Sequence, residues 1–226
     1  PERAQVNEAQ KTRMAIGHAV GDIACALHPD GVMVEADEGL GAAVATTRRL
    51  IAQGHPGPIF EATFEHDGVL VRTDILSRDG NDGWQMAEVK SSGGMKEYYL
   101  GDLATQVWVL DKAGIKLTGA AIRHLNTSFV LEREGDFEGL FADTDCLDLI
   151  AESVKGREQV VTQARTMLAG DEPGIAPGAQ CDKPFTCEFK NWCHLDLPPG
   201  PEWPVELLPR NGGVKWRERG FDNLLD

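Results

Sequence analysis

The chain has 226 residues, of which 42% are hydrophobic and 26% are charged. These values are ordinary for a globular protein, so the composition excludes wholesale disorder and fibrous repeats. Its apolar runs are only a few residues long, far short of the roughly 20 residues that cross a bilayer, and no secretory signal is visible. We therefore expect a cytoplasmic protein that does not associate with membranes.

The charge is strongly acidic, with 22 Lys and Arg against 36 Asp and Glu and a net charge of −14. This balance argues against a passive nucleic-acid coat, which needs a positive face to displace counterions from phosphates. It does not exclude an enzyme that binds nucleic acid in a local groove and uses carboxylates to hold a metal ion. Local cations that could contact phosphates are Arg48, Arg49, Lys215, Arg217 and Arg219.

Apolar spacing and turn residues predict a chain that alternates between helices and strands. We expect helices over residues 3–28, 39–53 and 96–113, and one long amphipathic helix over 145–168. We expect strands over residues 32–34, 59–65, 69–75, 84–89, 115–125 and 128–131, with a polar loop over 77–83. The three strands between residues 59 and 89 should form an antiparallel meander. This order predicts an α/β fold with a mixed central sheet flanked by helices.

The composition changes after Gly170, where Pro, Gly and Cys become frequent and a Pro-rich stretch leads to a short basic tail. We expect residues 1–170 to form the α/β core. Residues 171–226 should form a cysteine-rich and Pro-rich appendage that packs back on the core or begins a further domain. Because the chain starts at Pro1 and not at Met, we expect it to be part of a longer polypeptide.

The most specific chemical pattern lies on two neighbouring predicted strands. Asp74 is near the end of one strand, and Glu88 and Lys90 are two residues apart on the next, so the latter two side chains share a face. Carboxylates suit Mg²⁺ or Mn²⁺, and a lysine beside such an ion can activate or position water and stabilise charge on a phosphate. The pattern fits phosphodiester hydrolysis, although a Glu-x-Lys pair on a strand is more often a solvated ion pair.

The pattern Asp74-x13-Glu88-Val89-Lys90 resembles the PD-(D/E)XK nuclease core, specifically its RecB-like branch. The resemblance covers about residues 10–210 and implies a restriction-endonuclease-like core. It also implies that Asp74 and Glu88, with the Val89 carbonyl as a third ligand, hold Mg²⁺ or Mn²⁺. Lys90 would then activate or position the attacking water. The segments 17–34, 88–92 and 181–194 together resemble largely uncharacterised bacterial proteins with an N-terminal RecB-like nuclease domain.

Other positions match or depart from the family's motifs. Glu61 matches an acidic residue one strand earlier that would help to hold a second ion or water. Gln106 matches the glutamine of the last motif, which would orient Lys90 or the substrate phosphate. Relatives that carry a histidine in the first motif have it where this chain has Gly21, and the family's tyrosine after the glutamine corresponds to Leu110.

Three of the five cysteines, Cys181, Cys187 and Cys193, are spaced six residues apart near the end of the chain. An odd count without a secretory signal argues against a disulfide framework, and clustered thiolates favour metal binding. Zn²⁺ could use the three thiolates with His194. The resemblance to RecB-like nucleases instead implies a [4Fe-4S] cluster that joins the two ends of the nuclease domain. Its fourth ligand stays open between a cysteine upstream of Pro1, Cys25, Cys146 and His194.

We therefore expect a metal-dependent DNA nuclease of exonuclease type, with the iron–sulfur cluster as a structural clip. Its partners would be DNA with free ends or single strands, and a C-terminal domain or a helicase. Gly21, Leu110 and the acidic charge favour an alternative, a catalytically weak or inactive nucleic-acid-binding or scaffold module on the same fold. A third interpretation is an iron–sulfur sensor whose cluster gates another domain.

Overall fold

The computed structural model describes residues 3–80, 83–195, 199–210 and 212–225. The chain divides into two compact units, a larger one over Val6–Pro173 and a smaller one made of residues 1–5 and Gly174–Asp226. The division lies near the residue at which the composition changes. No helix in the described part of the chain is long and apolar enough to cross a membrane.

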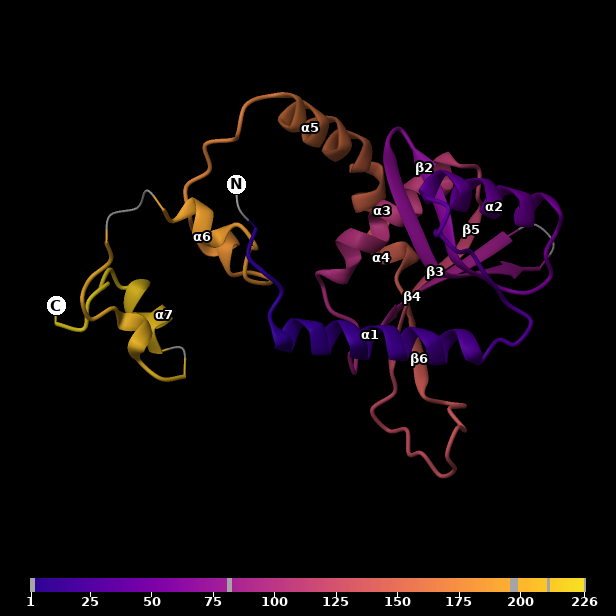
Figure 1. The fold of residues 1–226 in the computed structure, drawn as a ribbon, viewed down its shortest axis with the longest axis horizontal. Coiled ribbons are helices and arrows are strands. Elements are labelled where there is room, and N and C mark those ends of the chain that lie inside the picture. The colour runs from indigo at the N-terminus through magenta and orange to yellow at the C-terminus, as the bar shows by residue number, and fades with distance from the viewer. Residues whose placement is uncertain (1–2, 81–82, 196–198, 211, 226) are drawn as a thin grey trace. The chain divides into compact units, whose positions relative to one another are not determined.

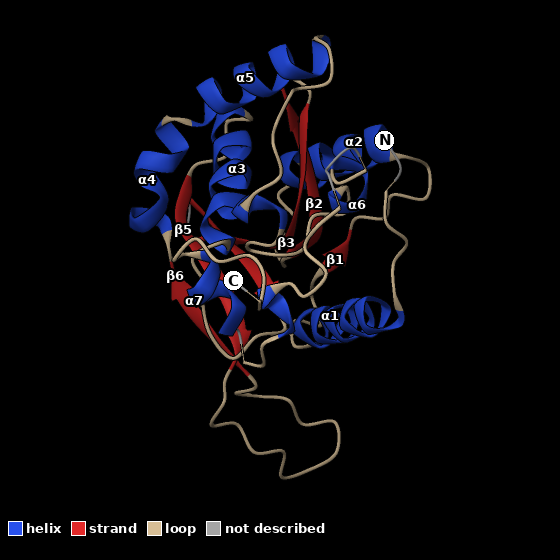
Figure 2. Ribbon diagram, turned by 90° about the vertical axis from the view of Figure 1, so that its left-hand side faces the viewer, coloured by secondary structure: helices blue, strands red, loops and turns tan. Residues whose placement is uncertain are grey.

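Within the described residues, the larger unit is built on a six-stranded mixed sheet with helices packed against it (Figures 1 and 2). The strands lie side by side in chain order: β1 (Val32–Met33), β2 (Ile59–His66), β3 (Val69–Asp79), β4 (Gly83–Lys90), β5 (Leu117–Leu125) and β6 (Phe141–Asp145). The helices are α1 (Glu8–Ala26), α2 (Leu40–Ala52), α3 (Tyr99–Lys112), α4 (Leu147–Lys155) and α5 (Arg157–Ala169). An α/β fold with a mixed sheet and flanking helices is therefore confirmed.

The central strands form the expected meander, because β2 pairs antiparallel with β3 and β3 pairs antiparallel with β4. β3 is longer than predicted, since its pairing with β4 continues to Asp79 and Gly83. The loop predicted over residues 77–83 is therefore wrong at both of its ends, because Ser77 and Asp79 belong to β3 and Gly83 begins β4. The parallel pairs β1–β2 and β4–β5 require crossover connections, which α2 and α3 supply.

The main core lies between one face of the sheet and the helices α2 to α5. α3 runs through its centre and buries side chains around much of its circumference, including Leu103, Val107 and Leu110. The opposite face of the sheet is covered by α1, whose Ala24 packs in a smaller cluster with Phe60, Ile75 and Ala87. The central strands are thus packed between the crossover helices α2 and α3 on one face of the sheet and α1 on the other.

The prediction of a strand over residues 128–131 is wrong. The chain turns there instead, because the Asn126 side chain accepts a hydrogen bond from the Ser128 backbone and the Asn126 carbonyl accepts one from Phe129. Such local side-chain bonds compete with strand pairing. β5 pairs with β4 on one side and with β6, rather than with residues 128–131, on the other; the loop between β5 and β6 extends away from the sheet (Figure 1).

Two helix predictions also need correction. The helix expected over residues 145–168 is divided at Gly156 into α4 and α5, which agrees with the low helix propensity of glycine. The first helix starts at Glu8 rather than at residue 3. Asn7 and Gln10 form a capping box in which each side chain accepts a hydrogen bond from the other residue's backbone, which fixes the start.

The smaller unit has short helical segments joined by extended chain: η1 (Ala179–Cys181), α6 (Lys190–Cys193), η2 (Val205–Leu207) and α7 (Gly212–Arg217). The start of the described chain belongs to this unit. Arg3 forms an ion pair with Glu188, and the Ala4 backbone N–H donates a hydrogen bond to the Glu188 carbonyl at 2.8 Å. The first residues of the chain therefore lie against the segment that contains Cys187.

The position of Leu110 in the core gives the first prediction. Leu110→Ala should lower the free energy of unfolding by about 2–5 kcal/mol, because it leaves a cavity in a fully buried region of α3. The control Leu149→Ala, on the exposed face of α4, should change it by no more than about 0.5 kcal/mol. Urea unfolding followed by far-UV circular dichroism measures both, and equal effects would contradict the assigned core.

Candidate active site

The candidate site lies where β3 and β4 diverge. The two strands pair from Asp79 and Gly83 as far as Ile75 and Ala87. Beyond that point β3 continues beside β2, and β4 continues beside β5. We call this point, at Asp74 and Glu88, the fork. The Val89 backbone N–H donates a hydrogen bond of 2.7 Å to Asp74 Oδ2, so a carboxylate takes the place of the strand partner.

Glu88 is held on both of its carboxylate oxygens. Lys90 Nζ donates to Oε1 at 2.7 Å, and Gln106 Nε2, from α3, donates to Oε2 at 2.8 Å. Glu88 and Gln106 are 8% and 4% exposed, so the contact is buried. The predicted convergence of Asp74, Glu88 and Lys90 is therefore present, and Gln106 joins it.

The fork concentrates negative charge in a poorly solvated place. Burial and the neighbouring charges of Glu88 and Glu61 raise the pKa of Asp74 to about 7, although the Val89 hydrogen bond and Lys90 oppose the shift. Burial also raises the pKa of Glu88, against the opposing effect of Lys90 and Gln106. The chain's own groups thus leave negative charge at the fork only partly compensated, which is the condition that a bound cation relieves.

Lys90 is the cation nearest to these carboxylates. Burial lowers its pKa, but its contact with Glu88 outweighs burial, so the pKa lies above its usual value. Asp102 Oδ2 lies 3.8 Å from Nζ, and the ring centroid of Tyr99 lies 5.4 Å away. Lys90 is therefore held as an ammonium group among acceptors.

Glu61 lies on β2, between residues whose partners flank Asp74 on β3. Its backbone has a φ of 52°, which is uncommon for a residue with a side chain. The alternation of the strand breaks there, because Ile59 and Ala62 both face the main core. The Glu61 carboxylate forms an ion pair with Arg72 Nε at 3.1 Å. The structure therefore brings Glu61 near the fork and balances its charge with Arg72.

The helix α1 contributes groups from the other face of the sheet. Burial and the charges of Asp74, Glu61 and Asp22 raise the pKa of the Cys25 thiol to about 11, so Cys25 is neutral beside the acidic groups. Gly21, one turn earlier, faces open space, since a Cβ added there would meet no atom within 4 Å.

We tested whether these residues suit a divalent cation. In the described parts of the chain, no cluster of three or more His, Cys, Asp or Glu side chains is arranged to hold a metal ion. Mg²⁺, however, is typically bound by only one or two carboxylates, with water and substrate phosphate as further ligands. Asp74 and Glu88 supply that number, and the buried Gln106 Oε1 has no hydrogen-bond partner among the described residues. The donor set at the fork fits Mg²⁺ or Mn²⁺.

The C-terminal cysteines belong to the smaller unit and are all free thiols. Cys181 is buried, whereas Cys187 and Cys193 are exposed, and the Cys187 N–H donates to the Cys181 carbonyl at 2.8 Å. The described residues do not gather the three thiols with His194 into a metal-binding group. Their role as cluster ligands therefore stays a prediction. Cys146, a candidate fourth ligand, is fully buried in the core of the larger unit.

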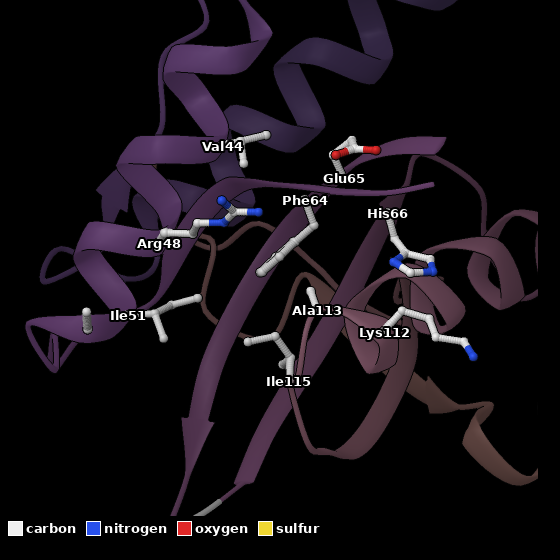
Figure 3. A pocket seen from close by; sticks show the side chains of 10 residues that line it. Val44, Arg48, Ile51, Phe64, Glu65, His66, Lys112, Ala113 and Ile115 are labelled. Carbon is white, nitrogen blue, oxygen red and sulfur yellow. The ribbon is translucent and has the colours of Figure 1, made fainter. Parts of the chain in front are cut away.

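A pocket of about 490 Å³ lies at the far end of α3 from the fork, between α2 and the end of β2 (Figure 3). Phe64, Ile51 and Ile115 form its apolar floor, and Figure 3 shows Arg48 reaching from α2 toward Phe64. None of the fork residues lines this pocket. The candidate chemistry is therefore located at the fork and not in this hollow.

Sequence reasoning missed three residues around the fork: Arg72, Tyr99 and Asp102. Arg72 lies two residues before Asp74, a spacing that could have drawn attention to it. Tyr99 and Asp102 reach Lys90 only because the first turn of α3 packs beside the end of β4. No local sequence signal identifies them.

Comparison with known proteins gave no match, either among protein-family models or among curated proteins. The resemblance to RecB-like nucleases therefore stays a prediction that depends on the residues at the fork.

The raised pKa of Asp74 gives a prediction for stability. Between about pH 4 and about pH 7, the folded state keeps a proton on Asp74 that the unfolded chain has released. The free energy of unfolding should therefore fall as the pH rises through this range. Asp74→Asn keeps an acceptor for the Val89 N–H and should raise the free energy of unfolding above pH 7 by up to about 4 kcal/mol.

Denaturant unfolding at several pH values, in EDTA, measures this effect. Asp111→Asn, which removes an exposed carboxylate from α3, is the matched control and should follow the wild-type curve. An Asp74→Asn protein that is less stable than the wild type at pH 8 would contradict the electrostatic account.

Proposed function

We propose that the protein is a Mg²⁺- or Mn²⁺-dependent deoxyribonuclease of the PD-(D/E)XK, RecB-like type, which hydrolyses phosphodiester bonds at DNA ends. The observation that carries this proposal is the fork itself. It combines two neighbouring carboxylates, the half-buried Asp74 and the buried Glu88, with a lysine and a glutamine that both donate to Glu88. An isolated surface ion pair would not need the second carboxylate or the buried glutamine. The proposal includes a restriction-endonuclease-like core as the finer description of the fold.

Asp74 and Glu88, with the Val89 carbonyl, would hold the metal ion, which would supply Lewis-acid stabilisation of the phosphate and activation of water. The protein's own groups have separate tasks. Val89 fixes the Asp74 carboxylate through its backbone N–H, and Gln106 fixes the plane of the Glu88 carboxylate. Both carboxylates are thus positioned before substrate arrives.

Lys90 suits the role of a hydrogen-bond donor. Its ammonium group lies within bonding distance of Glu88 and is half-buried, so it can turn to a phosphate oxygen or to the attacking water without leaving the site. A preorganised donor of this kind stabilises the charge that develops on the phosphate in the transition state. Glu61 would assist a second ion or water only after its ion pair with Arg72 is rearranged.

End-labelled single-stranded and double-stranded DNA, incubated with Mn²⁺ or Mg²⁺, tests the proposal. The wild-type protein should release the label, and EDTA should prevent this. Lys90→Ala and Glu88→Gln should each slow cleavage by at least about 100-fold, because each removes a group that stabilises the transition state or holds the metal ion. Protein purified without oxygen keeps any iron–sulfur cluster intact.

Lys116→Ala is the matched control for this assay. Lys116 is exposed and precedes β5 at the other end of β4, where its carbonyl accepts a hydrogen bond from the Trp84 N–H. The Lys116→Ala protein should cleave DNA at the wild-type rate. Cleavage that persists at that rate in Lys90→Ala would show that the fork is not the active centre.

A nucleic-acid-binding module with little catalysis is the second candidate. It is favoured by the pairing of two of the acidic groups, since both oxygens of Glu88 accept hydrogen bonds and Glu61 is paired with Arg72. The absence of cleavage by folded wild-type protein that still binds DNA would favour this candidate.

We further propose that Cys181, Cys187 and Cys193 are ligands of a [4Fe-4S] cluster that clips the smaller unit together. The proposal is supported by their spacing and by the contacts of Arg3 and Ala4 with Glu188, the residue that follows Cys187. A cluster would then stabilise a unit whose described residues bury few side chains.

Anaerobic reconstitution with iron and sulfide should produce a visible charge-transfer absorption band in the wild type. Cys187→Ser and Cys193→Ser should lose this band, whereas Cys146→Ala, in the larger unit, should keep it. Zinc bound in place of iron, together with its loss in His194→Ala, would contradict the cluster and support a zinc site.

A further inference from the structure

Two tyrosines and a lysine extend from the fork toward the surface. Tyr99, at the start of α3, has its ring centroid 5.4 Å from Lys90 Nζ. Tyr98 packs edge-on against Tyr99 with their ring centroids 4.6 Å apart. Lys96 Nζ lies 5.8 Å from the Tyr98 ring centroid and 6.0 Å from that of Tyr99. Each residue of this row thus contacts the next, from Glu88 through Lys90, Tyr99 and Tyr98 to Lys96.

The outer end of this row is open to solvent. Tyr98 is 39% exposed, Lys96 is exposed, and Tyr99 between them and the fork is half-buried. An exposed aromatic ring beside a cation offers both a stacking surface and a partner for a phosphate, the combination that single-strand-binding proteins use. In a chain with a net charge of −14, the exposed Lys96 supplies a cation beside these rings, whereas Lys90 is already paired with Glu88.

The row is held in place by hydrogen bonds. Tyr99 Oη donates to Ser92 Oγ at 3.1 Å, and Ser92 Oγ donates to the Gly94 carbonyl at 2.8 Å. The Leu125 N–H, on β5, donates to the Ser92 carbonyl at 2.9 Å. These bonds tie the loop between β4 and α3 to the sheet. They fix Tyr99, and Tyr98 Oη donates a hydrogen bond of 3.5 Å to Tyr99 Oη, so ordering of the two rings reduces the entropy lost when a ligand stacks on them.

We propose that Tyr98 and Lys96 form a stacking platform for an unpaired base of single-stranded DNA, so that strands enter the fork as single strands or frayed ends. The inference rests on the proposed nuclease function and specifies its substrate. An unpaired base exposes the face that stacking requires, whereas internal bases of a duplex are already stacked on their neighbours. Lys96 contacts the backbone phosphate of the same nucleotide.

Binding measured by fluorescence anisotropy in EDTA tests the platform without cleavage. The probes are a labelled oligothymidylate, an abasic oligonucleotide with the same number of phosphates, and a blunt two-stranded duplex with G·C pairs at both ends. Tyr98→Ala should weaken binding of oligothymidylate by about 5- to 30-fold, the loss expected for one stacked base. It should change the affinity for the abasic strand and the duplex by less than about twofold. Tyr98→Phe should bind as the wild type does.

Lys96→Ala should weaken binding of both single strands, with or without bases, and reduce the salt dependence of binding, because it removes one phosphate contact. Lys116→Ala is its matched control and should leave binding unchanged. Tyr98→Leu, which keeps an apolar side chain without a ring, should behave as Tyr98→Ala does. Circular dichroism verifies that each variant is folded.

Equal losses for the oligothymidylate and the abasic strand in Tyr98→Ala would overturn the platform, as would wild-type protein that binds neither. Two further outcomes distinguish failure of the nuclease proposal from failure of the platform. Base-dependent single-strand binding without metal-dependent cleavage would support the platform and reject the nuclease. Lys90-dependent cleavage with wild-type binding in Tyr98→Ala would support the nuclease and reject the platform.

Discussion

The hydrogen bond between the Val89 backbone and the Asp74 carboxylate is the contact on which the arrangement of the site depends. Where two strands diverge, the N–H groups that point into the gap lose their partners, and a buried N–H without a partner is costly. Asp74 supplies the missing acceptor. The same bond fixes a carboxylate at the fork by tying it to the backbone of β4, the strand that carries Glu88 and Lys90. One interaction therefore completes the sheet and positions the candidate chemistry.

The charges at the fork make this part of the protein less stable than an ordinary apolar core. Buried carboxylates are stable only when they are paired or hydrogen-bonded. Glu88 receives two donors, but Asp74 receives one and also lies in the field of Glu88 and Glu61. The left-handed backbone of Glu61 adds local strain of about 1–3 kcal/mol. Partly uncompensated charge and backbone strain in one place are typical of functional sites, where the arrangement that the chemistry requires lowers local stability.

The positions of the helices account for the rest of the site. α3 is both the crossover between the parallel strands β4 and β5 and the carrier of Gln106 in the middle of the main core. Its first turn carries Tyr99 and Asp102 to Lys90, so α3 joins the row of rings to the carboxylates and the lysine on β3 and β4. Leu110, also on α3, is fully buried among apolar neighbours of the main core and has no polar group to offer at the fork.

The sequence by itself predicted the order of the elements as far as β5 and the face shared by Glu88 and Lys90, since both follow from local periodicity, but it did not predict β6. It also indicated Asp74 through the hairpin, whereas Gln106 and Glu61 were expected only through the resemblance to a nuclease family. Local patterns failed where a competing bond or a glycine intervened, at Asn126 and Gly156. Only the tertiary structure decided that β3 and β4 diverge at the fork and that Arg72 balances Glu61. These features depend on how strands and helices distant in sequence pack together, which residue spacing does not record.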